Sequence, residues 1–204
     1  MFLTVLILIV MIVCIALLWN EGMWGNALTL VNVVLAALLA TSYYEPVATM
    51  MEARMPSFTY ICDFLAIWSV FSLSLLILRT TTDQISKHRV RFKMPVEVSG
   101  RIGFAILTAW VFACFFVATL HVSPLARTAI RGSFEPTIMG TRFLGLSPDR
   151  YWLAFVHSRS GGALSRREPS VFDAEGDWIP KYAARRKSFE DYNKREGKLR
   201  VRGR

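Results

Sequence analysis

The sequence predicts an all-α, polytopic membrane protein with four transmembrane helices, arranged as two helical hairpins, and a mixed, partly helical basic C-terminal tail. Three observations predict this class. Hydrophobic residues make up 53% of the 204-residue chain, and charged residues only 19%. Four apolar runs approach the roughly 20 residues that a helix needs to cross the hydrocarbon core of a bilayer. The net charge of +9 comes mostly from the C-terminal part that follows these runs and from one loop between them.

The apolar runs set the predicted domain boundaries. They are residues 2–19, 26–44, 60–78 and 102–120, and Asp63 is the single charged residue within them. Because each run is continuously apolar, without the alternation of a β-barrel strand, helices are favoured. A soluble protein with buried helices is a poor alternative for runs of this length and low charge. We therefore expect a four-helix transmembrane domain over 1–125 and an extramembrane tail over 126–204.

The first run could instead be a cleaved signal peptide. Such a peptide has a positively charged segment before a short apolar core, and small residues before the cleavage site. Here no Lys or Arg precedes the run, and the run ends in Leu-Leu-Trp-Asn. A retained span is therefore favoured.

The loops predict how the spans are paired and oriented. Residues 20–25 form a short connection, so the first two spans are expected to form a tight hairpin. After the second span, Glu45-Pro46 can start a short interfacial helix that ends before Pro56. The loop of 79–101 is basic, so the positive-inside rule places it in the cytoplasm and the N-terminus and tail outside. The tail is also rich in Lys and Arg, which leaves the inverted orientation open.

Two GxxG pairs stand at the entries to the second and fourth spans, in "GMWGNALTL" and "GRIGFAILT". Membrane helices associate through close packing, which small side chains permit. Small or polar residues continue every four positions, so they fall on one face of each helix. The expected packing residues are Gly22, Gly25, Asn32, Ala36, Ala40, Gly100, Gly103, Ala105, Ala109 and Ala113. The alternative is that alanine is simply common in membrane helices.

Asp63 and Asn32 are the candidate polar residues inside the spans. A carboxylate at membrane depth is costly and is a candidate for function. Asp63 lies near the start of its run, however, where the helix dipole alone would favour it. Asn32 lies deeper and is expected to form a hydrogen bond with another helix, worth about 1 kcal/mol.

The tail is expected to contain short helices at about 148–158 and 179–196, separated by a Ser- and Gly-rich linker. Ser147, Pro148 and Asp149 suit the first turn of the earlier helix. Basic side chains in the later helix and in the third loop can contact anionic lipid headgroups. These are Lys87, Arg89, Arg91 and Lys93 in the loop, and Lys181, Arg185, Arg186 and Lys187 in the tail. A solvated charged helix is the alternative for the tail cluster.

The sequence carries no recognised catalytic set. It has no GxSxG, P-loop, HExxH or nucleotide-binding fingerprint, and its three histidines are scattered. The cysteines Cys14, Cys62 and Cys114 lie in apolar runs without CxxC spacing, so neither a disulfide framework nor a metal site is expected. We expect no enzyme, no cofactor and no nucleic-acid partner. The expected partners are the lipid bilayer and either further copies of the chain or other membrane proteins.

The spans and glycine pairs together resemble the colicin V production (CvpA) family. The residues that carry the resemblance are Gly22 and Gly25, "LAALLATSYYEP" over 35–46 and "GRIGFAIL" over 100–107. The first loop departs from the family pattern, since it has Glu21 where basic residues are common. The resemblance covers about 3–125 and brings no catalytic residues. It implies a multi-pass protein of the bacterial inner membrane, tied to production or export of the toxin colicin V and to envelope maintenance.

A scaffold or assembly component is the function that this resemblance favours. An oligomeric channel or transporter is one alternative, and it would require Asn32 and Asp63 to face a common cavity. A membrane anchor for the basic tail is the other alternative.

Overall fold

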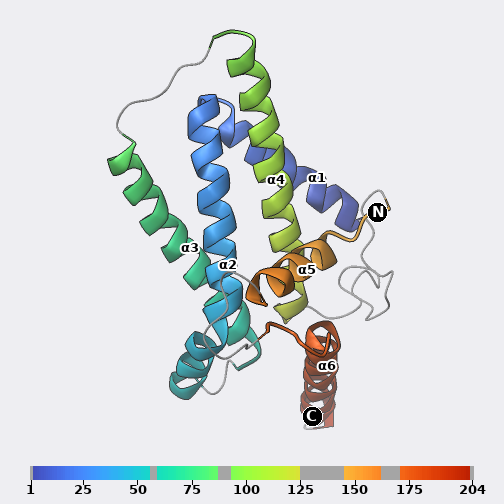
Figure 1. Ribbon diagram of the computed structural model, residues 1–204. Coiled ribbons are helices and arrows are strands. Elements are labelled where there is room, and N and C mark those ends of the chain that lie inside the picture. The colour runs from blue at the N-terminus through green and yellow to red at the C-terminus, as the bar shows by residue number, and fades with distance from the viewer. Residues whose placement is uncertain (1, 56–58, 87–92, 125–144, 162–170, 203–204) are drawn as a thin grey trace.

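The computed structural model shows six α-helices in the described part of the chain (Figure 1). The described residues are 2–55, 59–86, 93–124, 145–161 and 171–202. The helices are α1 (Phe2–Leu18), α2 (Met23–Arg54), α3 (Thr59–Ile85), α4 (Val96–Val122), α5 (Pro148–Ser160) and α6 (Trp178–Arg202). The predicted all-α class is therefore confirmed.

Three of the helices, α2, α3 and α4, are long and apolar enough to cross a membrane. They coincide with the second, third and fourth predicted spans. The apolar helix α1 has 17 residues, which is at the short end of the about 17–25 residues usual for a span. The chain is thus a helical protein with at least three membrane-span-like helices, and the fourth span stays a prediction.

Helix α2 lies between α3 and α4 and contacts both along much of its length (Figure 1). Helix α1 packs mainly against α4, not against α2, to which a short loop joins it. Its apolar contacts with α4 include Leu3 and Ile7 against Ala113 and Val117. The expected arrangement of two hairpins is therefore not confirmed, because the principal helix contacts cross between the two expected pairs.

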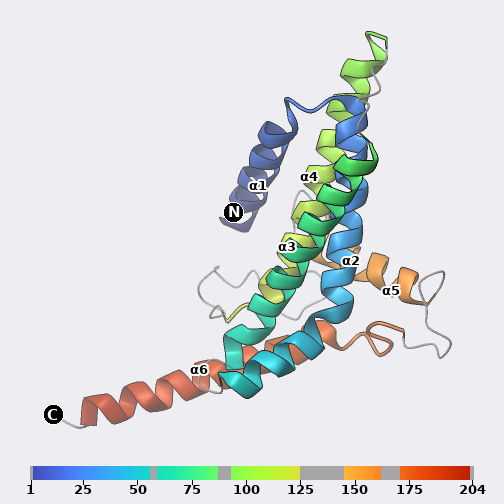
Figure 2. The same ribbon diagram turned by 90° about the vertical axis from the view of Figure 1, so that its left-hand side faces the viewer.

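Helix α2 is longer than its apolar run and contains Pro46. The expected separate interfacial helix after Glu45 is wrong, because the same helix continues to Arg54. Proline removes one backbone hydrogen bond and crowds the preceding turn, which bends a helix. Figure 2 shows the last part of α2 running across the lower end of the bundle.

The outer surface of the bundle is apolar on α1 and α3. Exposed side chains there include Ile12 and Leu17 of α1 and Leu73, Leu76 and Ile77 of α3. In contrast, the small side chains of α2 and α4 are buried, with Ala36, Ala40, Ala105, Ala109 and Ala113 at 3% exposure or less. This distribution suits helices whose inner faces meet each other and whose outer faces meet lipid.

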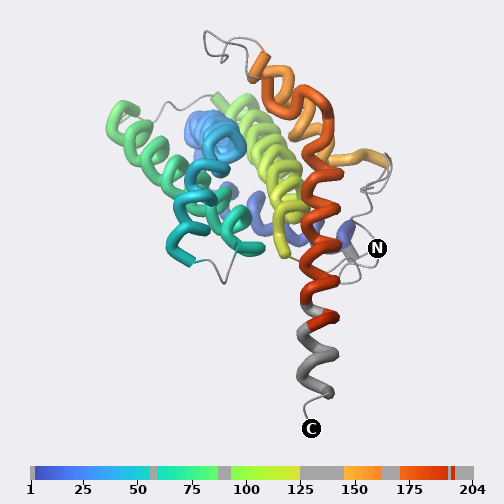
Figure 3. The backbone as a smooth tube through the Cα atoms, turned by 90° about the horizontal axis from the view of Figure 1, so that it is seen from below, coloured from blue at the N-terminus to red at the C-terminus, as the bar shows by residue number. Residues whose placement is uncertain are grey.

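The tail helices share the core of the bundle. Trp152 and Val156 of α5 and Trp178 of α6 belong to the same apolar cluster as Ala37 and Phe115 of the bundle. Figure 3, seen from below, shows α6 passing the lower end of α4 and extending beyond the other helices. The expected helices at 148–158 and 179–196 correspond to α5 and α6.

Candidate functional site

Polar side chains gather where the lower ends of α2, α3 and α4 meet the tail helices. We call this cluster the tail-docking site. Its members join the tail to the bundle through hydrogen bonds or ion pairs. They are Thr41, Tyr44, Glu52, Asp63, His121, Asp149, Trp152, Trp178, Tyr182 and Arg185.

Arg185 of α6 is the main cation of the tail-docking site. Its guanidinium forms two ion pairs. One is with Asp63 of α3, and the other is with Glu52 of α2, whose Oε1 lies 2.9 Å from Nη2 of Arg185. It also donates to the carbonyl oxygen of Thr59, at 2.8 Å. One guanidinium with several donors thus holds α6 against the beginning of α3 and the end of α2. Asp63 is buried, and its charge is compensated by the tail.

Aromatic side chains form a second group of contacts in the tail-docking site. The hydroxyls of Tyr44 and Tyr182 lie 2.9 Å apart, and Trp178 Nε1 donates to Tyr44 at 3.2 Å. Trp152 Nε1 of α5 donates to Thr41 Oγ1 of α2 at 3.1 Å. Burial raises the pKa of the Tyr182 phenol, so this hydroxyl stays protonated at neutral pH and remains a hydrogen-bond donor.

His121 and Asp149 form a buried pair between α4 and α5. The Nε2 of His121 lies 2.9 Å from Oδ2 of Asp149, and both side chains are 1% exposed. Asp149 stands in the first turn of α5, where the helix dipole favours a negative charge. The pair fixes the start of α5 beside the end of α4.

The opposite end of the bundle contains the GxxG pairs. The backbone nitrogen of Met23 donates to Glu97 Oε1 of α4, at 2.8 Å. A Cβ added at Gly100 would lie 2.2 Å from the sulfur of Met23, and one added at Gly22 would lie 3.0 Å from Glu97 Oε1. These two glycines therefore stand where α2 and α4 approach each other closely.

The second glycine of each pair lies in different surroundings. The nearest atoms to a Cβ at Gly25 belong to Glu21, with Oε2 at 2.9 Å, and a Cβ at Gly103 would meet nothing within 4 Å. The expectation that Gly103 packs against another helix is corrected, because this position is exposed. Residues three apart lie on similar faces of a helix, so Gly103 is open because no side chain of a neighbouring element fills the space one turn further along α4.

Asn32 and Asp63 do not share a cavity. Asn32 is buried and donates to Thr82 Oγ1 of α3, at 2.9 Å. Near it, Arg79 of α3 pairs with Glu21 at 2.9 Å. Asp63 belongs instead to the tail-docking site at the other end of α3.

The basic residues expected at lipid headgroups fall into three groups. Lys93, Lys181 and Lys187 are exposed, whereas Lys87, Arg89 and Arg91 lie outside the described residues. Arg185 and Arg186 differ from the expectation. Arg185 is engaged by the carboxylates of α2 and α3, and Arg186 is only 4% exposed. The apolar side chains flanking them in α6 turn this part of the basic cluster toward the bundle.

Several members of the tail-docking site have no signal in the sequence that would reveal their role. Tyr44 and Tyr182 resemble ordinary interfacial aromatic residues, and they lie 138 residues apart. In the sequence, His121 resembles an ordinary polar residue at the end of a membrane span. The Pro-Asp start of α5 indicates a helix but gives no indication that Asp149 meets a histidine.

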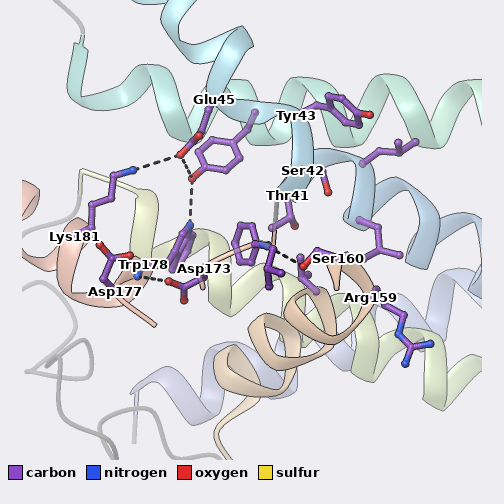
Figure 4. A pocket seen from close by; sticks show the side chains of 16 residues that line it. Thr41, Ser42, Tyr43, Glu45, Arg159, Ser160, Asp173, Asp177, Trp178 and Lys181 are labelled. Carbon is purple, nitrogen blue, oxygen red and sulfur yellow. Dashed lines mark hydrogen bonds and ion pairs between the residues drawn. The ribbon is translucent and has the colours of Figure 1, made fainter. Parts of the chain in front are cut away.

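A groove opens beside the tail-docking site, between α2 and the tail (Figure 4). Its volume is about 520 Å³. Leu38, Ser42 and Glu45 of α2 line one wall, and residues of α5 and α6 line the other. Lys181 lies 3.4 Å from Glu45 across this groove. The groove combines apolar, hydroxyl and charged side chains in its lining.

Comparison with known proteins identifies the membrane part of the chain. No curated protein and no solved structure matches it. The family described as Colicin V production protein matches residues 3–139, which take in α1 to α4 and end before α5. A match of this extent, over helices with the length and composition of membrane spans, establishes that the chain is a membrane protein belonging to the colicin V production family.

Proposed function

We propose that this chain acts as a scaffold or assembly component of the bacterial inner membrane, in toxin production or export and in envelope maintenance. The observation that supports this role is the tail-docking site. Ion pairs and aromatic hydrogen bonds fasten α5 and α6 to the bundle. The tail is thereby held in a fixed position at one end of the spans, and its outward side forms a surface for other proteins.

In this proposal α1 is the fourth span, and the loop of 79–101 faces the cytoplasm. The positive charge of that loop supports this orientation. The tail then lies on the outer side of the inner membrane, together with the N-terminus. The partners are the bilayer, other membrane proteins and further copies of the chain, and the chain has no catalytic activity or cofactor.

The contacts of Asn32 and Asp63 favour a scaffold over a channel. A pathway for ions would need several polar groups along one cavity. Asn32 donates to Thr82 within the bundle, whereas Asp63 pairs with Arg185 of the tail. Each of these two polar groups is paired with another side chain, and the two pairs lie at different heights along the bundle.

Photo-cross-linking in native membranes tests the proposed role. A photoreactive amino acid replaces Lys187, which is exposed on α6, in the full chain. We expect this position to capture a protein partner. The matched control carries the same amino acid at Leu76, an exposed apolar position of α3, and is expected to capture lipid or another copy of the chain.

Toxin export by the same bacterial cells provides a functional measurement. Charge reversal at Lys194 and Arg195, both exposed on α6, should lower toxin export and weaken cross-linking from position 187 while the chain still accumulates in the membrane. Full export, combined with no capture at position 187, would contradict the scaffold role. Truncation of the tail is a poorer test, because Trp152 and Trp178 belong to the core of the bundle.

A further inference from the structure

The groove beside α2 has an ordered polarity along one helix face. Leu38, Ser42 and Glu45 follow each other at intervals of four and three residues, so they lie on the same side of α2. From the apolar part of the helix outward, the wall changes from aliphatic to hydroxyl to carboxylate. The rise from Ser42 to Glu45 is about 4.5 Å along the helix. This is comparable to the separation of a phosphate and an amine within one phospholipid headgroup.

The tail supplies opposite charges at the two ends of the groove (Figure 4). Arg159 of α5 lies at the end of the groove opposite Lys181, with its side chain directed outward beside Phe155 and Ser158 of its own helix. Lys181 and Asp177 lie at the other end, where Lys181 reaches Glu45 and Asp177 lies beside Trp178. Within the described residues neither Arg159 nor Asp177 has an oppositely charged side chain as partner. The groove therefore offers a cation for a phosphate and carboxylates for an ammonium group.

We propose that this groove binds the headgroup of a zwitterionic phospholipid with a primary ammonium group, of the phosphatidylethanolamine type. The ammonium takes the place of Lys181 at Glu45, on the side of Asp177, and the phosphate lies at the hydroxyl of Ser42, toward which the exposed side chain of Arg159 turns on binding. The acyl chains leave along Leu38 and Leu39. The volume of about 520 Å³ falls in the range usual for a ligand pocket of about 300–1,000 Å³.

The charges favour this headgroup over the other common ones. An anionic headgroup without an amine would leave Asp177 without a counter-charge and Glu45 paired with Lys181, so it would gain no contact at this end of the groove. A quaternary choline has no N–H to donate to a carboxylate. The existing pair of Glu45 and Lys181 is 3.4 Å long and more than half exposed on both sides, so it is weak and a ligand ammonium can replace Lys181. The inference depends on a membrane location and is independent of the scaffold role.

Lipid retention by the full-length protein tests the site. The chain is reconstituted in nanodiscs with equal parts of phosphatidylethanolamine, phosphatidylglycerol and phosphatidylcholine. It is then transferred to a mild detergent, and the lipids that stay bound are counted by native mass spectrometry. We expect phosphatidylethanolamine to be enriched over the other two.

Two variants separate the ends of the groove. Glu45→Gln combined with Asp177→Asn should lower phosphatidylethanolamine retention roughly five-fold, the scale of an exposed ion pair, and leave phosphatidylglycerol unchanged or increased. Arg159→Gln should lower retention of both lipids, because both carry a phosphate. The control combines Glu175→Gln with Asp191→Asn, which removes the same charge from exposed positions outside the groove. Circular dichroism verifies that each variant keeps its helices.

Three results would overturn the inference. The first is equal retention of the three lipids by the unaltered chain, and the second is a preference for phosphatidylglycerol. The third is an equal loss of phosphatidylethanolamine in the control variant. Loss of toxin export without any change in lipid retention would instead concern the scaffold role alone.

Discussion

Asp63 joins α6 to the bundle through an ion pair with Arg185. It is buried near the start of α3, and its counter-charge comes from Arg185, 122 residues later in the chain. Removal of one member of a buried ion pair leaves the other charge without a counter-charge. The free-energy cost of this is larger than the net stabilisation that the intact pair provides. The same guanidinium also serves Glu52 and the Thr59 carbonyl. A change at Asp63 should therefore loosen the tail without removing every contact of Arg185.

We predict that Asp63→Asn lowers the free energy of unfolding by about 1–3 kcal/mol. This is below the about 3–5 kcal/mol of a fully buried pair, because the Arg185 side chain is 31% exposed. Thermal unfolding in a mild detergent measures the loss, and limited proteolysis shows whether the tail is released first. The double variant with Arg185→Gln should lose less than the sum of the two single variants.

Asp83→Asn is the matched control for this measurement. Asp83 pairs with Arg79 within α3, but its side chain is 61% exposed, so its loss should cost less than about 1 kcal/mol. Equal effects of the two aspartate variants, or additive effects of Asp63→Asn and Arg185→Gln, would show that the ion pair does not hold the tail.

The sequence identifies individual polar residues better than it identifies their partners. Asp63 and Asn32 are recognisable because a polar group in an apolar run is rare. Their partners, Arg185 and Thr82, lie in segments whose polar residues have many possible roles. Tyr44 and His121 give no such signal, since each sits at the end of a span where polar and aromatic side chains are common.

At the scale of elements, α2 and α4 form the closest contact at their GxxG ends. Only the first glycine of α4, Gly100, faces another helix, where Met23 fills the space that a side chain would need. Gly103 lies one turn further on and is open. The two positions have the same residue type and nearly the same depth, so they form a matched pair.

We predict that Gly100→Ala destabilises the protein by about 1–3 kcal/mol, because an added methyl group would overlap Met23. Gly103→Ala should be neutral or stabilising, since alanine is the better helix former and nothing obstructs its side chain. Thermal unfolding of the two variants in the same detergent compares them. A larger loss for Gly103→Ala would show that the close contact lies elsewhere.

The extents of the helices follow from hydropathy more directly than their packing does. The second, third and fourth apolar runs correspond to α2, α3 and α4 because continuous apolar segments have one stable form in lipid. The end of α2 at Arg54 is less accessible to sequence reasoning, since the helix continues through Pro46 with a bend. The packing of α1 on α4 is not predictable in the same way, because α1 is apolar on all sides and presents no distinct face.

The whole molecule has two polar ends separated by an apolar middle. One end holds Glu21, Arg79 and Glu97 around the glycine contact, and the other holds the tail-docking site. In between, exposed aliphatic side chains cover α1 and α3. Such a layered surface suits a protein that crosses the bilayer with one polar end on each side.

We predict that single cysteines at the two ends are labelled from opposite sides of the membrane. Cys14, Cys62 and Cys114 are first replaced by alanine, and Lys93→Cys or Glu175→Cys is then introduced at exposed positions near opposite ends of the bundle. A membrane-impermeant maleimide added to spheroplasts should label position 175, and it should label position 93 only after the membrane is permeabilised. The physical reason is the basic loop beside Lys93, which the positive-inside rule retains in the cytoplasm. Labelling of position 93 alone in closed spheroplasts would establish the inverted orientation, and labelling of both would contradict a bundle that spans the bilayer between them.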